Sequence, residues 1–198
     1  HASCGTCAVR VDGKEVLPCI VPLAACKGGD MTIEPLRNFP VVGDLVVDVS
    51  AFFQRQAAAG MVITRDAEET IDGHAFEPSE LLQPDGKLER RHYNRFENCV
   101  ECGICLSACP TLSASDGFFG PAGLAAVHRA WEKSTNELER AALLELADRE
   151  GGVWQCHGAF ECSEACPQDF DPAGAIMDLR RALIRNKLAA LFGSRRTR

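Results

Sequence analysis

The stretch Cys99-Val100-Glu101-Cys102-Gly103-Ile104-Cys105-Leu106-Ser107-Ala108-Cys109-Pro110 carries the strongest structural signal in this chain. Four cysteines at this spacing, with proline after the last, are typical of bacterial iron-sulfur proteins. In that arrangement three thiolates hold one cluster and the fourth reaches across to a second cluster. The stretch therefore predicts two neighbouring clusters, and it requires a second cysteine run elsewhere in the chain.

The partner run lies toward the carboxyl end and reads Cys156-x5-Cys162-x3-Cys166-Pro167. When the four-cysteine spacing is laid over this run, the second position falls on Ala159, so one iron lacks its thiolate. A cubane cluster without one protein ligand tends to lose that iron and become 3Fe-4S, or to take an external ligand. We therefore expect one 4Fe-4S and one 3Fe-4S cluster in the second half of the chain.

A crossed pairing assigns every cysteine of the two runs. We expect the 4Fe-4S cluster to be bound by Cys99, Cys102, Cys105 and Cys166. We expect the 3Fe-4S cluster to be bound by Cys109, Cys156 and Cys162. Zinc is the main alternative for so many thiols, but zinc sites ask for two CxxC-like pairs around one tetrahedral ion. All seven cysteines of the two runs are accounted for as ligands of two clusters, and this complete assignment disfavours zinc and disulfides.

A third cysteine group near the start reads Cys4-x2-Cys7-x11-Cys19. Plant-type 2Fe-2S sites have the pattern C-x4-C-x2-C with a fourth cysteine further on, and Cys4 and Cys7 fit its second and third members. The first member would lie upstream of His1, so we expect the chain to begin inside a cluster-binding loop. Cys26 is left over and is interpreted as a small buried thiol.

The cysteine-free middle of the chain indicates a domain boundary. Residues 65–91 are rich in Asp, Glu, Pro and Gly and contain few apolar residues. We therefore divide the chain into a 2Fe-2S domain over 1–62, a linker over 63–90 and a second domain over 91–198.

The first domain is predicted to be rich in strands. The segments 8–11 and 14–17 flank Asp12 and Gly13, a turn pair that is a strong hairpin signal because both residues accept positive φ. A further short strand is predicted over 31–35. A helix is expected over 45–56, with Asp44 as its N-cap.

The second domain is predicted to be helical. Apolar and charged residues alternate at helical spacing over 120–132 and 135–149. The last helix begins at Pro172, with Asp171 as its cap. Its predicted buried stripe consists of Ile176, Leu179, Leu183, Ile184, Leu188 and Leu191.

The charge and hydropathy of the chain limit its partners. The formal net charge is -7, which argues against a nucleic-acid partner because phosphate binding needs a basic field. No stretch approaches the roughly eighteen uninterrupted apolar residues of a membrane span. The arginines at the carboxyl end are interpreted as a solvated tail, with anionic lipid headgroups as the alternative partner.

The three cysteine motifs, in this order, resemble the iron-sulfur subunit of succinate dehydrogenase and fumarate reductase. The segments 38–48 (NFPVVGDLVVD) and 119–124 (FGPAGL) match the family as well. The resemblance implies an α+β fold. A plant-type β-grasp ferredoxin domain carrying 2Fe-2S, here expected to be truncated at its start, precedes an α-helical ferredoxin domain carrying 4Fe-4S and 3Fe-4S.

The resemblance also implies a function. In this family electrons pass between FAD on a flavoprotein subunit and a membrane quinone, through 2Fe-2S, 4Fe-4S and 3Fe-4S in that order. The dicarboxylate site is on the flavoprotein, and membrane anchor subunits carry haem b in some members. The expected location is peripheral, on the cytoplasmic face of the inner membrane or the matrix face of mitochondria.

The resemblance implies that Pro110 and His157 lie near the quinone, and the alternative for His157 is that it only orders the cluster loop. Members that use ubiquinone commonly have tryptophan shortly after this proline, whereas this chain reads Thr-Leu-Ser-Ala over 111–114. Menaquinone is therefore at least as plausible as ubiquinone. The alternative function is a ferredoxin-like subunit of another flavoprotein oxidoreductase, or a soluble electron carrier.

Overall fold

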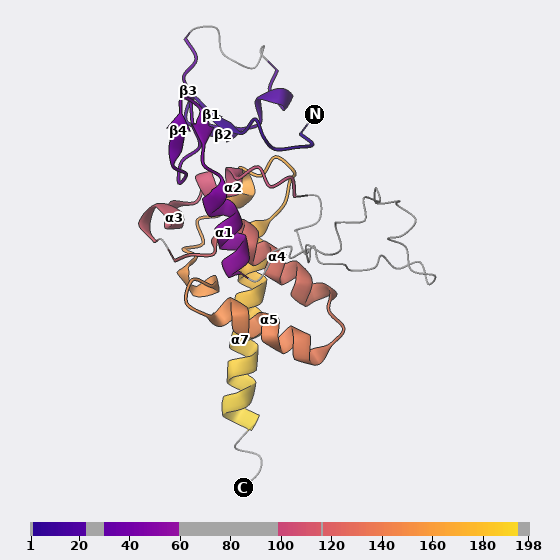
Figure 1. Ribbon diagram of the computed structural model, residues 1–198. Coiled ribbons are helices and arrows are strands. Elements are labelled where there is room, and N and C mark those ends of the chain that lie inside the picture. Colours follow the sequence, from indigo (N-terminus) through magenta and orange to yellow (C-terminus); the bar gives the residue numbers. More distant parts are fainter. Residues whose placement is uncertain (1, 23–29, 60–98, 116, 194–198) are drawn as a thin grey trace, which may run out of the picture.

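The structure is a computed structural model that describes residues 2–22, 30–59, 99–115 and 117–193. The strands lie at one end of the molecule and the long helices extend toward the other (Figure 1). The predicted linker over 63–90, both of its boundaries and Cys26 lie outside the described residues.

The predicted hairpin is present in the N-terminal domain. Strands β1 (Val9–Val11) and β2 (Lys14–Val16) pair antiparallel, with Val9 opposite Val16. Asp12 and Gly13 form the turn, and their φ values of 49° and 81° are the positive angles that this turn pair was expected to adopt. Strand β3 (Ile33–Glu34) pairs antiparallel with the other side of β1, so the sheet order is β2-β1-β3.

The helix predicted over 45–56 is wrong in its first part. Strands β4 (Val41–Gly43) and β5 (Val46–Val47) form a second antiparallel pair, and α1 (Ser50–Ala58) begins only after them. Asp44 is not an N-cap, because it lies in the turn between the strands with a φ of 47°. Asp48 instead accepts a hydrogen bond from the Ser50 amide, over 2.8 Å, at the start of α1.

The second domain is helical, as predicted. Helix α5 begins after Asn136, whose side-chain oxygen accepts from the amides of Leu138 and Glu139 over 2.9 and 3.4 Å. The helices are α2 (Ile104–Ser107), α3 (Pro110–Ala114), α4 (Gly120–Lys133), α5 (Glu137–Asp148), α6 (Glu161–Glu164) and α7 (Pro172–Gly193). Short 3-10 turns occupy Pro18–Ile20 and Val153–Gln155.

Helix α7 begins as predicted but is buried over only part of its length. Asp171 accepts a hydrogen bond from the Gly174 amide over 2.8 Å and so caps the helix. Of the predicted stripe, the buried members are Ile176, Leu179 and Leu183, and the exposed members are Ile184, Leu188 and Leu191. The stripe prediction is wrong for the second half because α7 continues beyond the helices that cover its first half (Figure 1).

The core joins the two domains. Helices α4 and α7 pack through buried residues such as Leu124, Val127 and Leu179, and Phe52 of α1 is also buried. Between α1 and α4 the backbones approach so closely that a Cβ at Gly123 would stand 3.3 Å from the Ala59 Cβ. Among the described residues, no helix combines the length and apolarity needed to span a membrane.

Candidate iron-sulfur centres

The two cysteine runs of the helical domain have the same local backbone conformation. In the first run Cys102 precedes Gly103, which has a φ of 76° and begins the four-residue helix α2. In the second run Ala159 precedes Phe160, which has a φ of 63° and begins the four-residue helix α6. Ala159 therefore occupies the backbone position of a ligand cysteine but offers only a methyl group.

The first cysteine of each run has matching hydrogen bonds. The Cys99 sulfur accepts from the Glu101 amide and the Cys156 sulfur accepts from the Gly158 amide, each over 3.4 Å. Both donor residues have positive φ values, 53° for Glu101 and 71° for Gly158. The two runs thus repeat one loop-and-helix unit, with a thiol missing from the second copy.

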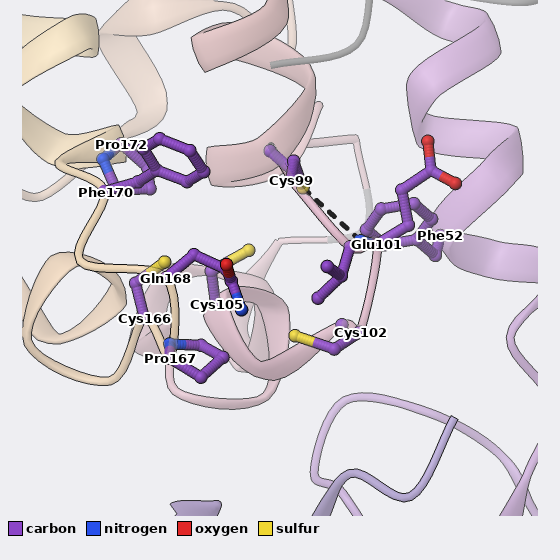
Figure 2. Close-up of a pocket in the computed structure, with 13 residues that line it drawn as sticks. Phe52, Cys99, Glu101, Cys102, Cys105, Cys166, Pro167, Gln168, Phe170 and Pro172 are labelled. Carbon is purple, nitrogen blue, oxygen red and sulfur yellow. Dashed lines mark hydrogen bonds between the residues drawn. The ribbon is translucent and has the colours of Figure 1, made fainter. Parts of the chain in front are cut away.

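Four cysteines from both runs line one cavity of the helical domain, namely Cys99, Cys102, Cys105 and Cys166. Figure 2 shows their side chains around a common space, with Phe52, Pro167 and Phe170 among the apolar residues at its edge. Three of these thiols precede or lie on α2, and the fourth comes from the loop before α7. This donor set fits a 4Fe-4S cluster, because four thiolates are the usual ligands of that cluster.

The three thiol groups are numbered along the chain: the first is Cys4, Cys7 and Cys19, the second is the four cysteines that line the cavity, and the third is Cys109, Cys156 and Cys162. Burial, together with the charges of the nearby thiols of Cys109 and Cys156, raises the pKa of Cys162 to about 12. Cys109 and Cys156 thus both lie close to Cys162, and the exposed Ala159 lies in the loop that follows Cys156. This donor set fits a cluster with three protein ligands.

Burial also favours the protonated thiol at two of the cysteines that line the cavity. It raises the pKa of Cys102 to about 11 and that of Cys105 well above its usual value, with the charges of neighbouring thiols adding to the effect. Iron would therefore replace a proton at the sulfurs of Cys102 and Cys105. No three His, Cys, Asp or Glu side chains in the described ranges are arranged to hold a single metal ion. The ligand assignments stay predictions that rest on the shared cavity and on the proximity of the thiols.

The N-terminal thiols lie in a different environment. Cys4 and Cys19 are exposed, and Cys7 is half-buried. Hydrogen bonds from Thr6 lower the pKa of Cys4, and the Ala2 amide, which donates to the Cys19 sulfur over 3.4 Å, lowers the pKa of Cys19. Cys19 also interacts with Cys4 and Cys7, so the structure brings the three predicted 2Fe-2S ligands together. Lowered thiol pKa values favour the thiolate form that binds iron.

The loop of the first thiol group, which holds Cys4 and Cys7, packs directly on the loop of the second group, which holds Cys102. Gly5, between Cys4 and Cys7, contacts Val100 and Cys102 and leaves no room for a side chain. Sequence spacing could not reveal this contact because it joins segments far apart in the chain.

Arg180 is a site residue that the sequence analysis missed. Its guanidinium group donates to the Val153 carbonyl, over 2.9 Å from Nε, and to the Cys156 carbonyl. A partly buried cation therefore holds the peptide of a predicted 3Fe-4S ligand. The sequence contained a signal for this residue: Arg180 lies on α7 at helical spacing from the buried Ile176 and Leu183, so it shares their face of the helix.

The two predicted quinone-proximal residues are exposed. Pro110 is the first residue of α3 and follows Cys109, and His157 follows Cys156 in the loop before α6. Each is thus adjacent in the chain to a thiol of the third group. Their role toward a quinone stays a prediction.

Models of two known families match separate parts of the chain. Residues 1–54 match the model of a 2Fe-2S iron-sulfur cluster binding domain. Residues 95–170 match the model of a 4Fe-4S dicluster domain. Both matches contain the cysteine groups described above.

Several relatives match across most of the chain. The fumarate reductase iron-sulfur subunit of Haemophilus influenzae is 36% identical over 180 residues, which cover 88% of this chain and 69% of the relative. That of Mycobacterium tuberculosis is 35% identical over 175 residues, covering 87% and 67%. The mitochondrial succinate dehydrogenase [ubiquinone] iron-sulfur subunit of Dictyostelium discoideum is 28% identical and covers 92% and 63%.

A solved structure shares the fold. One chain of the Mycobacterium smegmatis Sdh1 complex in the apo form aligns with a TM-score of 0.69 at 24% identity, covering 95% of this chain and 76% of that one. This alignment and the two domain matches support the predicted α+β fold. The chain belongs to the family of fumarate reductase and succinate dehydrogenase iron-sulfur subunits.

Proposed function

We propose that the chain is the electron-transfer subunit of a succinate:quinone or quinol:fumarate oxidoreductase. The observation that carries the proposal is the assembly of three thiol groups in one chain, with the first group packed on the second. Iron-sulfur clusters in these groups would supply one-electron carriers, and the protein supplies their ligands and spacing. The dicarboxylate chemistry belongs to a flavoprotein partner.

The proposed ligands are those derived from the sequence. The 2Fe-2S ligands are Cys4, Cys7 and Cys19, with a fourth upstream of His1. The 4Fe-4S ligands are Cys99, Cys102, Cys105 and Cys166, and the 3Fe-4S ligands are Cys109, Cys156 and Cys162.

The order of electron transfer follows from contacts between the thiol groups. Gly5 brings the first loop against Cys102 of the second group. Cys105 in turn lies near Cys166 of its own group and Cys162 of the third, since the charges of both thiols raise its pKa. The second group therefore stands between the other two, which supports the order 2Fe-2S, 4Fe-4S, 3Fe-4S.

The proposed partners lie at the two ends of this path. A flavoprotein subunit with FAD would lie at the 2Fe-2S end, and membrane anchor subunits, with haem b as an optional group, at the 3Fe-4S end. The subunit would be peripheral, on the cytoplasmic face of the inner membrane or the matrix face of mitochondria. The exposed Pro110 and His157 flank the third group, where a quinone could approach from outside the chain.

Low-temperature EPR of the purified complex tests this proposal. We expect three cluster signals, including the 3Fe-4S signal in the oxidised state, and co-purification with a flavoprotein and an anchor subunit. A complex without the oxidised 3Fe-4S signal would contradict the assignment around Ala159. Purification as a lone soluble carrier would instead favour the ferredoxin-like alternative, and zinc without acid-labile sulfide would overturn both.

A further inference from the structure

Asn38 reaches from the N-terminal domain into the helical domain. Its backbone φ is 63°, a left-handed conformation that few residues other than glycine and asparagine adopt readily. The residue lies in the segment between β3 and β4. A residue held in this conformation often has a specific structural or functional reason for it, and here the side chain supplies one.

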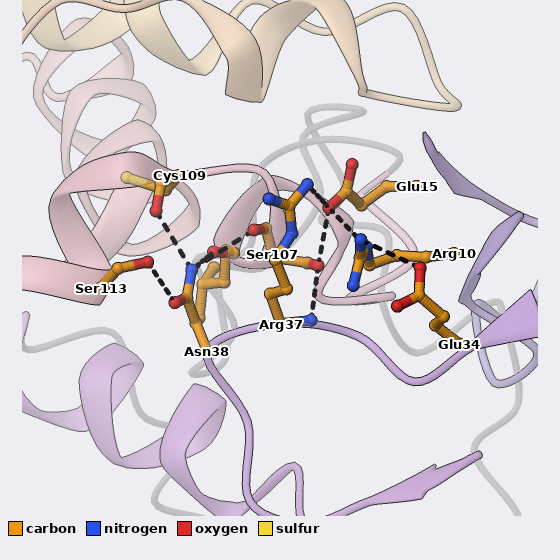
Figure 3. Close-up of polar contacts among 9 residues, drawn as sticks. Arg10, Glu15, Glu34, Arg37, Asn38, Ser107, Cys109 and Ser113 are labelled. Carbon is orange, nitrogen blue, oxygen red and sulfur yellow. Dashed lines mark hydrogen bonds and ion pairs between the residues drawn. The ribbon is translucent and has the colours of Figure 1, made fainter. Parts of the chain in front are cut away.

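The side-chain amide of Asn38 binds the end of α2 and the residue that precedes α3. Nδ2 donates to the carbonyls of Leu106, Ser107 and Cys109 over 2.7, 3.3 and 3.1 Å. Oδ1 accepts from the Ser113 hydroxyl over 2.8 Å. Figure 3 shows the amide between these partners. All four contacts are consistent with the same orientation of the amide, with Nδ2 toward the three carbonyls and Oδ1 toward the hydroxyl.

The Ser107 carbonyl needs an external donor, whereas the Leu106 carbonyl already accepts from the Cys109 amide over 3.2 Å. The last carbonyls of a helix have no partner within the helix, and α2 ends at Ser107. The Cys109 carbonyl belongs to the N-cap residue of α3, and the Asn38 amide gives it a donor from outside that helix. Leu106, Ser107 and Cys109 are all buried, at 3%, 2% and 7% exposure, so water is a poor substitute.

The neighbouring residue reinforces the same contact. The Arg37 amide donates to the Ser107 hydroxyl oxygen over 2.9 Å, and that hydroxyl donates to a carboxylate oxygen of Glu15 over 3.0 Å. The Arg37 guanidinium group also reaches the Glu15 carboxylate, over 3.2 Å. Two consecutive residues of the N-terminal domain, Arg37 and Asn38, therefore form hydrogen bonds with the end of α2 in the helical domain (Figure 3).

We propose that Asn38 is a positioning residue. It fixes the peptide of Cys109, so that the Cys109 thiol faces the other two thiols of the third group. The proposal rests on the proposed role of Cys109 as a 3Fe-4S ligand. It means that the N-terminal domain completes the ligand loop of a cluster that it does not itself bind. Groups that orient metal ligands in this way typically change metal affinity or activity by about 10- to 100-fold when removed.

Three variants separate the amide from the backbone conformation. Asn38→Gly keeps access to positive φ but removes the side chain. Asn38→Asp keeps the shape and replaces the donor with an oxygen that repels the three carbonyls. The control Ser113→Ala keeps all three donated hydrogen bonds and removes only the hydrogen bond accepted by Oδ1.

The experiment is EPR spin quantitation and redox titration of the full chain in its complex. We expect Asn38→Gly and Asn38→Asp to reduce the 3Fe-4S spin count by about tenfold, or to shift its midpoint potential and line shape, while the 4Fe-4S signal is retained. Ser113→Ala should match the wild type.

Three outcomes would overturn the proposal or its basis. Unchanged 3Fe-4S spin count, line shape and potential in both Asn38 variants would exclude a positioning role. Equal loss of all cluster signals, together with loss of helical circular dichroism, would show that Asn38 serves general stability only. If the wild type itself lacks a 3Fe-4S signal, the proposed function fails before the variants are compared.

Discussion

Gly5 lies against Cys102 with no space between them for a side chain. A Cβ at Gly5 would stand 2.8 Å from the Cys102 Cβ and 2.6 Å from the Val100 carbonyl oxygen. The φ of Gly5 is 70°, so both its conformation and its surroundings require glycine. The first two thiol loops can thus lie this close only because residue 5 is glycine, which has a hydrogen atom where alanine has a methyl group.

Gly5→Ala should therefore separate these two loops. We expect a loss of stability of about 1–3 kcal/mol and a weaker magnetic interaction between the 2Fe-2S and 4Fe-4S clusters. The control is Gly13→Ala, because Gly13 also has positive φ but has no atom within 4 Å of an added Cβ. If both variants weaken the cluster interaction equally, the contact with Cys102 is not the cause.

Ala159→Cys should supply the missing thiol. The Ala159 backbone matches that of Cys102, so the new sulfur would face the third group. We expect the 3Fe-4S EPR signal to be replaced by a 4Fe-4S signal, and quinone reduction to slow. Ala114→Cys, which adds an exposed thiol outside both runs, should leave the spectrum unchanged. A wild-type spectrum in Ala159→Cys would refute the ligand alignment.

Arg180→Met should lower the reduction potential of the third cluster. The variant removes a cation and the hydrogen bonds to the carbonyls of Val153 and Cys156. Because the reduced cluster is more negative, it loses more stabilisation than the oxidised cluster. A potentiometric EPR titration measures the shift, and Arg180→Lys should be intermediate. Arg181→Met, on the exposed side of α7, is the control.

The partial burial of His128 predicts that the protein loses stability in acid. Burial lowers its pKa, although the carboxylates of Glu132 and Asp178 oppose the shift and Arg129 assists it. The unfolded chain therefore binds the proton more readily, so stability is greatest above the unfolded pKa of about 6.5 and falls as the pH decreases through and below that value.

Thermal unfolding at pH 7.5 and pH 5.5 measures this effect. His128→Gln should lose a few degrees less than the wild type between the two conditions, because glutamine does not titrate. The control His157→Gln removes an exposed imidazole. An identical loss in the wild type and His128→Gln would show that protonation of His128 does not contribute.

Local patterns predicted most of the fold. The Asp12-Gly13 turn, the Asp171 cap and the helices α4 and α5 each depend on residues a few positions apart, and the structure contains all of them. The failures came from longer-range effects. Asp44 can cap a helix or turn a hairpin, and only the pairing of β4 with β5 decides between these roles.

The candidate site was predictable to a similar degree. Cysteine spacing grouped the thiols, because iron-sulfur ligands come in short runs. The contacts of Asn38, Gly5 and Arg180 were not predictable, since each joins segments that are distant in the chain. The second half of α7 shows the same limit, because apolar spacing reveals a stripe but not what covers it.

The crossing of the two cysteine runs has a consequence for biosynthesis. Cys166 lies in the same cavity as Cys99, Cys102 and Cys105, although it is the last of the cysteines to be synthesised. A ribosome must therefore translate the chain past Cys166 before the first run has its full set of thiols. On the proposed ligand assignment, neither half of the helical domain holds the full ligand set of a cluster, and a nascent chain stalled before Cys166 would expose a set of thiols without its closing member.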